Sequence, residues 1–322
     1  MEETTIMSPK LNKFKAGIVI FFLLTVSHAF AAENPYKDVE VDRATGRVIY
    51  EFNRFDFLES IVSGPDGAIF TTNLLQGIIY QFKNGKLSKL TDVYGKLVGL
   101  GLSDNENLIV TGSDSQNKAV VFHVNINTGK TTTITTIPDA LLLNGISKID
   151  DHHFLIADSF KGVIWKLDVR DGSVSIWLDD DLLASPSVET QSPGINGIKI
   201  HSNAAYISNT GKMLMVKIPF MKNGSAGKPE VIQENVFIDD FAMDETGNIY
   251  GATHVYDSVI KITPQGGVTI IAQSDQGVSG STCVTMQYGS KNTLLVSTNG
   301  GMLKPDPCNV VPAKIVELEL RK

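Results

Sequence analysis

Hydrophobic and polar residues alternate over short stretches along most of the chain, and turns separate these stretches. The segment Leu141–Asp168, LLLNGISKIDDHHFLIADSFKGVIWKLD, shows the pattern clearly. An apolar run that contains Asn144 is followed by a polar turn, a stretch from His153 to Ala157, a polar loop and a stretch from Val163 to Leu167. Alternation with a period of two residues, bounded by Asp, Ser and Gly, is typical of β-strands, and no helical period is sustained. We therefore predict three short strands in this segment.

The same succession of apolar stretches and turns occurs six times along the chain. Successive turns between a first and a second stretch are 39 to 51 residues apart. Six units of this length, with about four strands each, are typical of a six-bladed β-propeller. We therefore predict an all-β fold of this architecture. The six turns lie near Gly67, Glu106, His152, Asn203, Gly247 and Ser290.

The two ends of the repeated region complement each other. The last unit ends with the stretch Lys314–Leu320 and lacks a fourth strand, whereas the alternating segment Arg47–Phe52 precedes the first full unit. Pairing of these two segments would remove an exposed sheet edge and close the ring. No low-complexity linker divides the chain, so we predict a single propeller domain over residues 32–322.

The first 31 residues are predicted to be a secretory signal peptide. Three lysines precede the apolar run Ala16–Val26, and Ala29-Phe30-Ala31 offers small residues for cleavage. The run is shorter than the roughly 20 residues that span a bilayer, which argues against the alternative of a retained membrane anchor. We expect a secreted or periplasmic protein that has no contact with a membrane after cleavage.

The charge and the absence of several motifs limit the classes of partner. The formal net charge is −7 and basic residues are not clustered, so nucleic acid is a poor candidate. The sequence has no phosphate loop, dinucleotide fingerprint, nucleophile elbow or zinc-protease helix motif. We expect a monomeric protein whose partner is a small-molecule substrate.

Polar residues occupy the same position in four of the six predicted first strands. Each lies seven or eight residues before its turn, whereas the other two units have Val98 and Thr282 there. Because first strands line the channel of a propeller, these side chains should converge near its mouth. Two carboxylates and two amides offer oxygen ligands, which favours Ca²⁺, with Mg²⁺, Mn²⁺ or Zn²⁺ as alternatives. The other interpretation is that they satisfy backbone groups around the channel. The four candidate ligands are Glu59, Asn144, Asn196 and Asp239.

A second set of polar residues lies at the ends of the predicted second strands, which return to the level of the candidate ligands. We expect Asp158, Asn209 and His254 to contact a substrate there, although turns favour Asp and Asn for local reasons as well. His254 could also transfer a proton, because an unperturbed imidazole titrates near neutral pH.

Three motifs resemble the metal-site motifs of the senescence-marker-protein/gluconolactonase superfamily, which includes regucalcin and bacterial gluconolactonases. They are Leu143-Asn144-Gly145, Asn196-Gly197-Ile198 and the segment Asp239–Gly247. The resemblance extends from about Phe57 to Leu320 and implies a six-bladed propeller. It also implies that one divalent cation is bound by the four candidate ligands.

The sequence departs from the sugar-lactone enzymes of this superfamily at two positions. Leu142 stands where those enzymes have a substrate-binding Arg, which implies a substrate less polar than a sugar lactone. Asp240 stands where the family usually has Gly, so the fourth ligand could lie one residue after Asp239. The motifs resemble an uncharacterised secreted branch of the superfamily, some members of which are similar to fungal enzymes that guide cyclisations.

The leading functional hypothesis is a secreted, metal-dependent hydrolase of a lactone or related ester, with Asp239 as the catalytic base. One alternative is a propeller that binds a small molecule without hydrolysing it and keeps the metal for structure. Another is a cyclase or isomerase that folds an apolar substrate in the cavity.

The two cysteines of the mature chain are predicted to form a disulfide. Cys283 lies seven residues before the sixth turn, at the start of a first strand, and Cys308 belongs to the long connection Asn299–Pro312 on the same face. A bridge would fix this connection as a wall of the pocket. The alternative is two unpaired cysteines.

Overall fold

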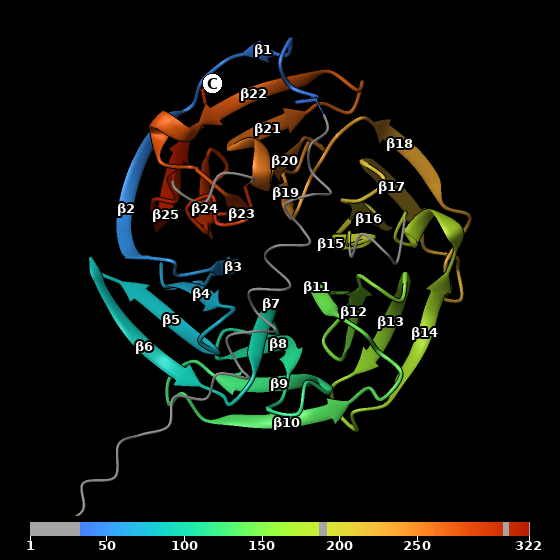
Figure 1. The fold of residues 1–322 in the computed structure, drawn as a ribbon. Helices are drawn as coiled ribbons and strands as arrows, with labels where there is room; N and C mark the ends of the chain where they lie inside the picture. The colour runs from blue at the N-terminus through green and yellow to red at the C-terminus, as the bar shows by residue number, and fades with distance from the viewer. Residues whose placement is uncertain (1–32, 187–191, 305–308, 322) are drawn as a thin grey trace, which may run out of the picture.

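Six β-sheets surround a central axis in the computed structural model, which describes residues 33–186, 192–304 and 309–321 (Figure 1). Five of these sheets have four strands. The remaining sheet, which contains β19 to β22 (residues 241–273), has a fifth, short strand, β1 (Glu40–Val41), at its outer edge. The predicted all-β, six-bladed propeller is confirmed. The predicted signal peptide, residues 1–31, lies outside the described residues. Among the residues that the structure does describe, no helix is long and apolar enough to cross a membrane.

Each of the first three blades is an antiparallel meander that runs from the channel to the periphery. Blade 1 is β3 (Leu58–Ser63), β4 (Ile69–Asn73), β5 (Ile78–Lys83) and β6 (Lys86–Asp92). Blade 2 is β7 (Lys96–Leu102), β8 (Asn107–Ser113), β9 (Ala119–Asn125) and β10 (Thr131–Thr136). Blade 3 is β11 (Leu143–Lys148), β12 (His153–Asp158), β13 (Val163–Asp168) and β14 (Val174–Asp179).

The other three blades follow the same plan, with three short 3₁₀ helices, η1 (Asp181–Leu183), η2 (His254–Tyr256) and η3 (Ser274–Gln276). Blade 4 is β15 (Ile195–His201), β16 (Ala204–Asn209), β17 (Leu214–Pro219) and β18 (Glu230–Glu234). Blade 5 is β19 (Phe241–Met243), β20 (Ile249–Ala252), β21 (Ser258–Ile262) and β22 (Val268–Gln273). Blade 6 is β23 (Ser281–Met286), β24 (Thr293–Thr298), β25 (Pro312–Glu319) and β2 (Thr45–Arg54).

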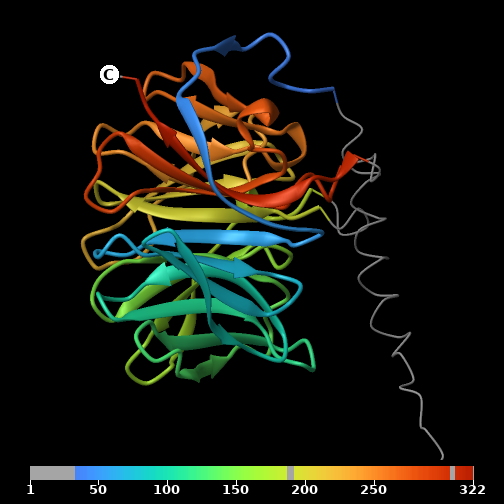
Figure 2. The ribbon, with the colours of Figure 1, turned by 90° about the vertical axis from the view of Figure 1, so that its left-hand side faces the viewer.

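The ring is closed by the N-terminal strand β2, which pairs antiparallel with β25 as the outer strand of blade 6. This confirms the closure predicted for Arg47–Phe52. The structure adds a feature that the sequence analysis missed, because β1 (Glu40–Val41) pairs in parallel with β22 of blade 5. The N-terminal segment therefore crosses the outside of two neighbouring blades before it enters the ring (Figure 2).

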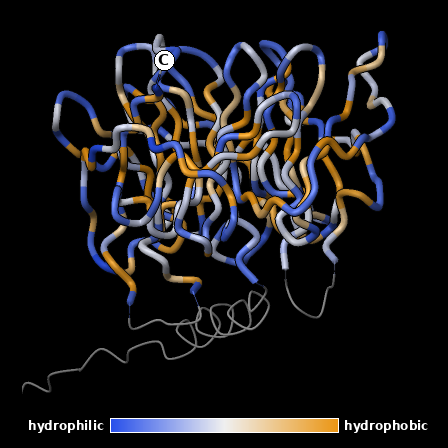
Figure 3. Tube along the Cα trace, turned by 90° about the horizontal axis from the view of Figure 1, so that it is seen from above, coloured by the Kyte–Doolittle hydropathy of each residue, from blue (hydrophilic) through white to orange (hydrophobic). Residues whose placement is uncertain are grey.

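The hydrophobic core lies between the faces of neighbouring blades. One cluster joins Ala68 and Phe70 of blade 1 to Val110 and Phe122 of blade 2, and similar clusters join other neighbouring blades. The second strand β8 is buried over most of its length, whereas the outer strand β10 has no fully buried residue. Burial on both faces explains why the inner strands are near-continuous apolar runs. Figure 3 shows these hydrophobic stretches inside the ring and hydrophilic residues at the turns.

Candidate functional site

The candidate ligands are presented to the channel by irregular strand pairing. In five blades the register between the first and second strands shifts at the start of the first strand. The shifts lie between Leu58 and Ile61 in blade 1, Leu97 and Leu100 in blade 2, Leu143 and Ile146 in blade 3, Ile195 and Ile198 in blade 4, and Ser281 and Cys283 in blade 6. Glu59, Asn144 and Asn196 lie inside three of these shifts. A β-bulge changes the direction of a side chain and interrupts the ladder locally. Repeated bulges therefore place the residues of successive blades at one height.

The four candidate ligands line one cavity at the end of the channel where the first strands begin. Its volume is about 260 Å³. Glu59, Asn144, Asn196 and Asp239 reach it from blades 1, 3, 4 and 5. The structure thus brings together four residues that span 180 positions of the sequence.

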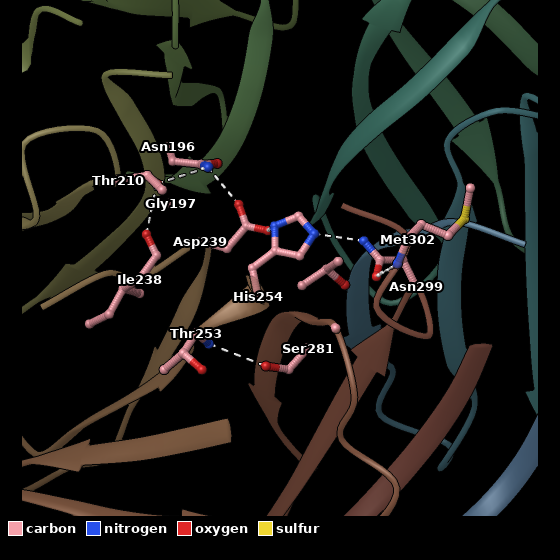
Figure 4. Close-up of polar contacts among 12 residues, drawn as sticks. Asn196, Gly197, Thr210, Ile238, Asp239, Thr253, His254, Ser281, Asn299 and Met302 are labelled. Carbon is pink, nitrogen blue, oxygen red and sulfur yellow. Dashed lines mark hydrogen bonds and ion pairs between the residues drawn. The ribbon is translucent and has the colours of Figure 1, made fainter. Parts of the chain in front are cut away.

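Hydroxyl groups hold the two amides in one orientation. Asn144 Nδ2 donates to Ser159 Oγ at 3.2 Å, and Asn196 Nδ2 donates to Thr210 Oγ1 at 3.1 Å. The Thr210 hydroxyl in turn donates to the carbonyl of Ile238 at 2.8 Å (Figure 4). Because each amide is held through its nitrogen, its oxygen is left available to a ligand in the cavity.

Asp239 has one satisfied and one unsatisfied carboxylate oxygen. Its Oδ1 accepts from Asn196 Nδ2 at 2.5 Å. Its Oδ2 lies 2.8 Å from His254 Nδ1, but the ring N–H does not point at it, and this buried oxygen has no hydrogen-bond donor among the described residues. A buried carboxylate oxygen without a donor is costly unless something else compensates its charge.

His254 is positioned at the cavity by its backbone and by a contact at ring nitrogen Nε2. Its φ of 49° lies in the left-handed region, which few residues other than glycine adopt. Asn299 Nδ2 lies 2.6 Å from His254 Nε2, and Asn299 Oδ1 accepts from the backbone of Gly301 and Met302, so the amide nitrogen faces the ring (Figure 4). His254 lines the cavity as expected, but its contacts suit the positioning of Asp239 better than free proton transfer.

Negative charge is concentrated at this end of the channel. Burial, followed by the charges of Asp239 and Asp240, raises the pKa of Glu59 well above its ordinary value. Two carboxylates and two outward-facing amide oxygens match the preferences of a hard divalent cation such as Ca²⁺. The described residues contain no cluster of three or more His, Cys, Asp or Glu suited to a metal, so the amides are essential to this donor set.

Asp158 and Asn209 do not line the cavity, which corrects the expectation that they contact substrate. Asp158 accepts from the backbone of Leu141, Leu142 and Lys161 and from Trp165 Nε1. Asn209 donates to two carbonyls next to η1 and accepts from the backbone three residues later. Both side chains are buried and cap turns, the local role that Asp and Asn favour.

The walls of the cavity are apolar. Leu142 lines the cavity as expected. Apart from Lys96 and the polar residues described above, large hydrophobic side chains dominate the lining. They are Phe57, Leu74, Leu75, Val98, Leu141, Leu142, Leu143, Phe160, Pro193, Phe237 and Leu303.

Asp240 is engaged elsewhere, which decides between the two acidic residues. Its Oδ1 accepts from Lys199 Nζ at 2.6 Å and from the backbone of Phe241, and the Cys283 thiol lies 3.2 Å from its Oδ2. Asp240 lines a second, smaller cavity and not the one that contains the candidate ligands. Asp239 is therefore the better candidate for the fourth ligand.

The structure has Cys283 as a free, buried thiol, and burial raises its pKa well above the ordinary value. Its predicted partner, Cys308, lies outside the described residues. The disulfide therefore stays a prediction.

The sequence analysis missed Ser159 and Thr210 as supports of the site. A signal for both exists, because each hydroxyl directly follows the turn-capping residue of a blade that carries a candidate Asn ligand, as Asp158-Ser159 and Asn209-Thr210. Asn299, like His254, lies at the end of a predicted second strand, but the sequence does not predict the contact between these two residues, which are 45 positions apart.

Fold and cavity together define a six-bladed propeller with an oxygen-rich site on its axis. No protein-family model matches the sequence, and no curated protein sequence matches it. Solved structures do match. Regucalcin from Agrobacterium tumefaciens, a calcium-binding protein, has a TM-score of 0.69 at 17% identity, over 88% of this chain and 97% of that chain.

Two enzymes give similar values. A luciferin-regenerating enzyme has a TM-score of 0.67 at 13% identity, over 86% of this chain and 95% of its own. A gluconolactonase from Xanthomonas campestris has a TM-score of 0.66 at 11% identity, over 88% of this chain and 91% of its own. The predicted resemblance to the regucalcin and gluconolactonase superfamily is thus confirmed for the fold, whereas the secreted branch stays a prediction.

Proposed function

We propose that this protein is a secreted or periplasmic hydrolase that uses a divalent cation, preferably Ca²⁺, to open a lactone or related ester of low polarity. The observation that carries the proposal is the cavity in which two carboxylates and two oriented amides meet, with Asp239 Oδ2 lacking a hydrogen-bond donor. We further propose that the protein acts on small molecules as a monomer.

The donor set fits a divalent cation. The two carboxylates balance its charge, and the amide oxygens, turned inward by Ser159 and Thr210, complete an all-oxygen set. When bound, such a cation would polarise the substrate carbonyl and stabilise the negative charge that develops on its oxygen.

The protein residues have distinct roles in this proposal. Asp239 is placed to accept a proton from the attacking water, because its carboxylate faces the cavity and is held by Asn196 and His254. His254, fixed by Asn299, keeps that carboxylate in position. The apolar walls, including Leu142, bind the remainder of the substrate and exclude bulk water from the site.

A second candidate function is a propeller that binds or cyclises an apolar molecule without hydrolysis. The apolar walls of the cavity favour it.

A panel of alkyl lactones, sugar lactones and aryl esters tests the proposal on the purified mature protein, with added calcium and with chelator. We expect hydrolysis of alkyl lactones that is lost with chelator and restored by calcium. Hydrolysis that is insensitive to chelator would contradict the role of the cation. Calcium binding by calorimetry without turnover of any compound would favour the second candidate.

A further inference from the structure

The cavity is not symmetric around the channel, because it extends outward over blade 2. In blades 1, 3, 4 and 5 its lining comes from residues in or just before the first strand and from the turn after the second strand, and in blade 6 it comes from Leu303. In blade 2 it continues along the end of β8 to the first residue of β9. We call this extension the blade 2 groove, and it is lined by Lys96, Val98, Gly112, Ser113, Asn117 and Ala119.

Small side chains open this groove. Ala119 pairs with Ser113 at the start of the third strand of blade 2. The matching residue is much larger in blades 1, 3 and 4, where it is Ile78, Val163 and Leu214. The smallest of these four side chains therefore stands where the groove runs.

Gly112 also lines the groove, and its lack of a side chain lets the neighbouring strand β7 approach β8 closely. A Cβ at this position would lie 2.0 Å from the carbonyl oxygen of Lys96, so the backbone itself approaches too closely for any side chain. At the level of the candidate ligands, blade 2 offers the apolar Val98 in place of an oxygen donor. Blade 2 is thus adapted to contain an apolar group and not to bind the cation.

The neighbouring blades supply the walls of the groove. The turn of blade 1 carries Leu74 and Leu75, and blade 3 contributes Leu142 and Phe160. The corresponding turn of blade 2 is the polar segment Asp114–Lys118, which is folded tightly by hydrogen bonds to the Asp114 carboxylate. Its Asn117 lines the outer end of the groove and is exposed, so the groove opens to solvent there.

We propose that the blade 2 groove holds an unbranched aliphatic arm of the substrate, whose ester or lactone head lies beside Asp239. This inference rests on the proposed function and specifies its substrate class. An alkyl arm would replace water on the leucine and phenylalanine walls at no cost in hydrogen bonds. A polyhydroxylated arm would lose hydrogen bonds to water and would find polar partners at Lys96, Ser113 and Asn117 alone among the groove residues.

Binding of ring-amide analogues separates this inference from catalysis. γ-Butyrolactams with an alkyl arm of one to eight carbons at the ring carbon are titrated into the calcium-loaded protein by calorimetry. We expect affinity to rise by up to about fourfold for each methylene, the factor that corresponds to ~0.8 kcal/mol per buried CH₂, until the groove is filled. Affinity that is independent of arm length would overturn the proposal.

A substitution inside the groove and a matched one outside it locate the arm. Ala119→Leu introduces the residue that blade 4 has at this position, and should lower the ratio of eight-carbon to one-carbon affinity by about tenfold or more. Val163→Leu makes the matching change in blade 3, away from the cavity, and should leave the ratio unchanged. Equal ratios in the two variants would place the arm elsewhere and overturn the proposal.

The two hypotheses can fail separately. Arm-dependent lactam binding without hydrolysis of any alkyl lactone would contradict the proposed hydrolase and support the groove. Hydrolysis of alkyl lactones at rates independent of arm length, in the wild type and in Ala119→Leu, would contradict the groove and support the hydrolase.

Discussion

Two consecutive acidic residues, Asp239 and Asp240, face opposite ends of the channel and have different surroundings. Asp239 lines the cavity of about 260 Å³ at the end where the first strands begin, and one of its buried oxygens has no hydrogen-bond donor in the described part of the chain. Asp240 lines a cavity of about 170 Å³ further along the same strands, and Lys199 neutralises it at 2.6 Å.

The protein compensates the charge of Asp240 with its own side chains, but not fully that of Asp239. At the Asp240 end an ion pair and a backbone N–H satisfy the carboxylate, which stabilises the folded chain. At the Asp239 end the carboxylate is held in position by Asn196, one of its buried oxygens has no hydrogen-bond donor among the described residues, and burial raises the pKa of the nearby Glu59. Uncompensated buried charge is a feature of functional sites.

The largest expected effect concerns the two aspartates themselves. Asp239→Asn should lower the rate of lactone hydrolysis by about 10²–10⁴-fold, because the proton acceptor is lost while the size of the side chain is retained. Steady-state kinetics of lactone hydrolysis with added calcium measures this change in rate. The matched variant Asp240→Asn should lose far less activity, and a reversed order of the two variants would show that the assignment of the base is wrong.

The hydroxyl that orients Asn196 should matter for cation affinity. Thr210→Val removes the acceptor for the Asn196 amide nitrogen and should weaken calcium binding by about 10–100-fold, the usual effect of losing a group that orients a ligand. Calorimetric titration with calcium measures the change. Thr210→Ser retains the hydroxyl and should bind nearly as the wild type does; equally weak binding by both variants would indicate a general packing defect.

At the other end of the channel, loss of the Lys199 ammonium group that pairs with Asp240 should reduce the stability of the fold. Lys199→Met leaves Asp240 without its partner and should lower the free energy of unfolding by about 1–2 kcal/mol, less than for a fully buried pair because the Lys199 side chain is 25% exposed. Lys291→Met breaks an ion pair with Glu245 in which both side chains are 74% exposed, and should cost at most about 0.5 kcal/mol. Urea unfolding in the presence of chelator measures both losses. Equal losses of stability in Lys199→Met and Lys291→Met would show that the ion pair of Asp240 matters no more than an exposed one.

The smallest effect concerns a turn carboxylate beyond the channel, Asp244. Burial raises its pKa, but hydrogen bonds from Asn248, Thr246 and Tyr250 together outweigh burial, so the pKa is lowered overall. A lowered pKa stabilises the folded state above the ordinary carboxyl range and loses this contribution as pH falls through the folded-state pKa. Because Asp244 is partly exposed and solvent screens its interactions, Asp244→Ala should lower the free energy of unfolding by only about 0.5 kcal/mol near pH 7, and by less below about pH 4.

Urea unfolding at several pH values measures this difference between Asp244→Ala and the wild type. Glu245→Ala, one residue later and exposed, serves as the control and should change stability little at any pH. A cost of Asp244→Ala that stays constant down to pH 3 would show that the carboxylate charge is not responsible.

The sequence predicted the candidate ligands because they occur at one position of a local repeat. Glu59 and Asn144 each lie the same number of residues before a turn, and strands of equal length place equal offsets at equal heights. Asp158 and Asn209 were predicted in the same way, but they do not line the cavity. Each lies at the predicted strand end, but its side chain turns into the loop, where backbone N–H groups bind it. Offset along a strand predicts height in the channel but not the direction of a side chain at a turn.

The sequence by itself determined the strands, their sixfold repetition, the closure by the N-terminal strand and the four polar residues that line the cavity, because alternation, turn residues and spacing are local properties. The tertiary structure alone decided that Asp239 and not Asp240 faces the ligand cavity, that Asn299 fixes His254, and that the cavity extends over blade 2. Each of these depends on contacts between residues that are distant in sequence, such as Lys199 with Asp240 and His254 with Asn299. Those contacts form only when the ring closes and the bulges set the direction of each side chain, so no pattern within a single blade encodes them.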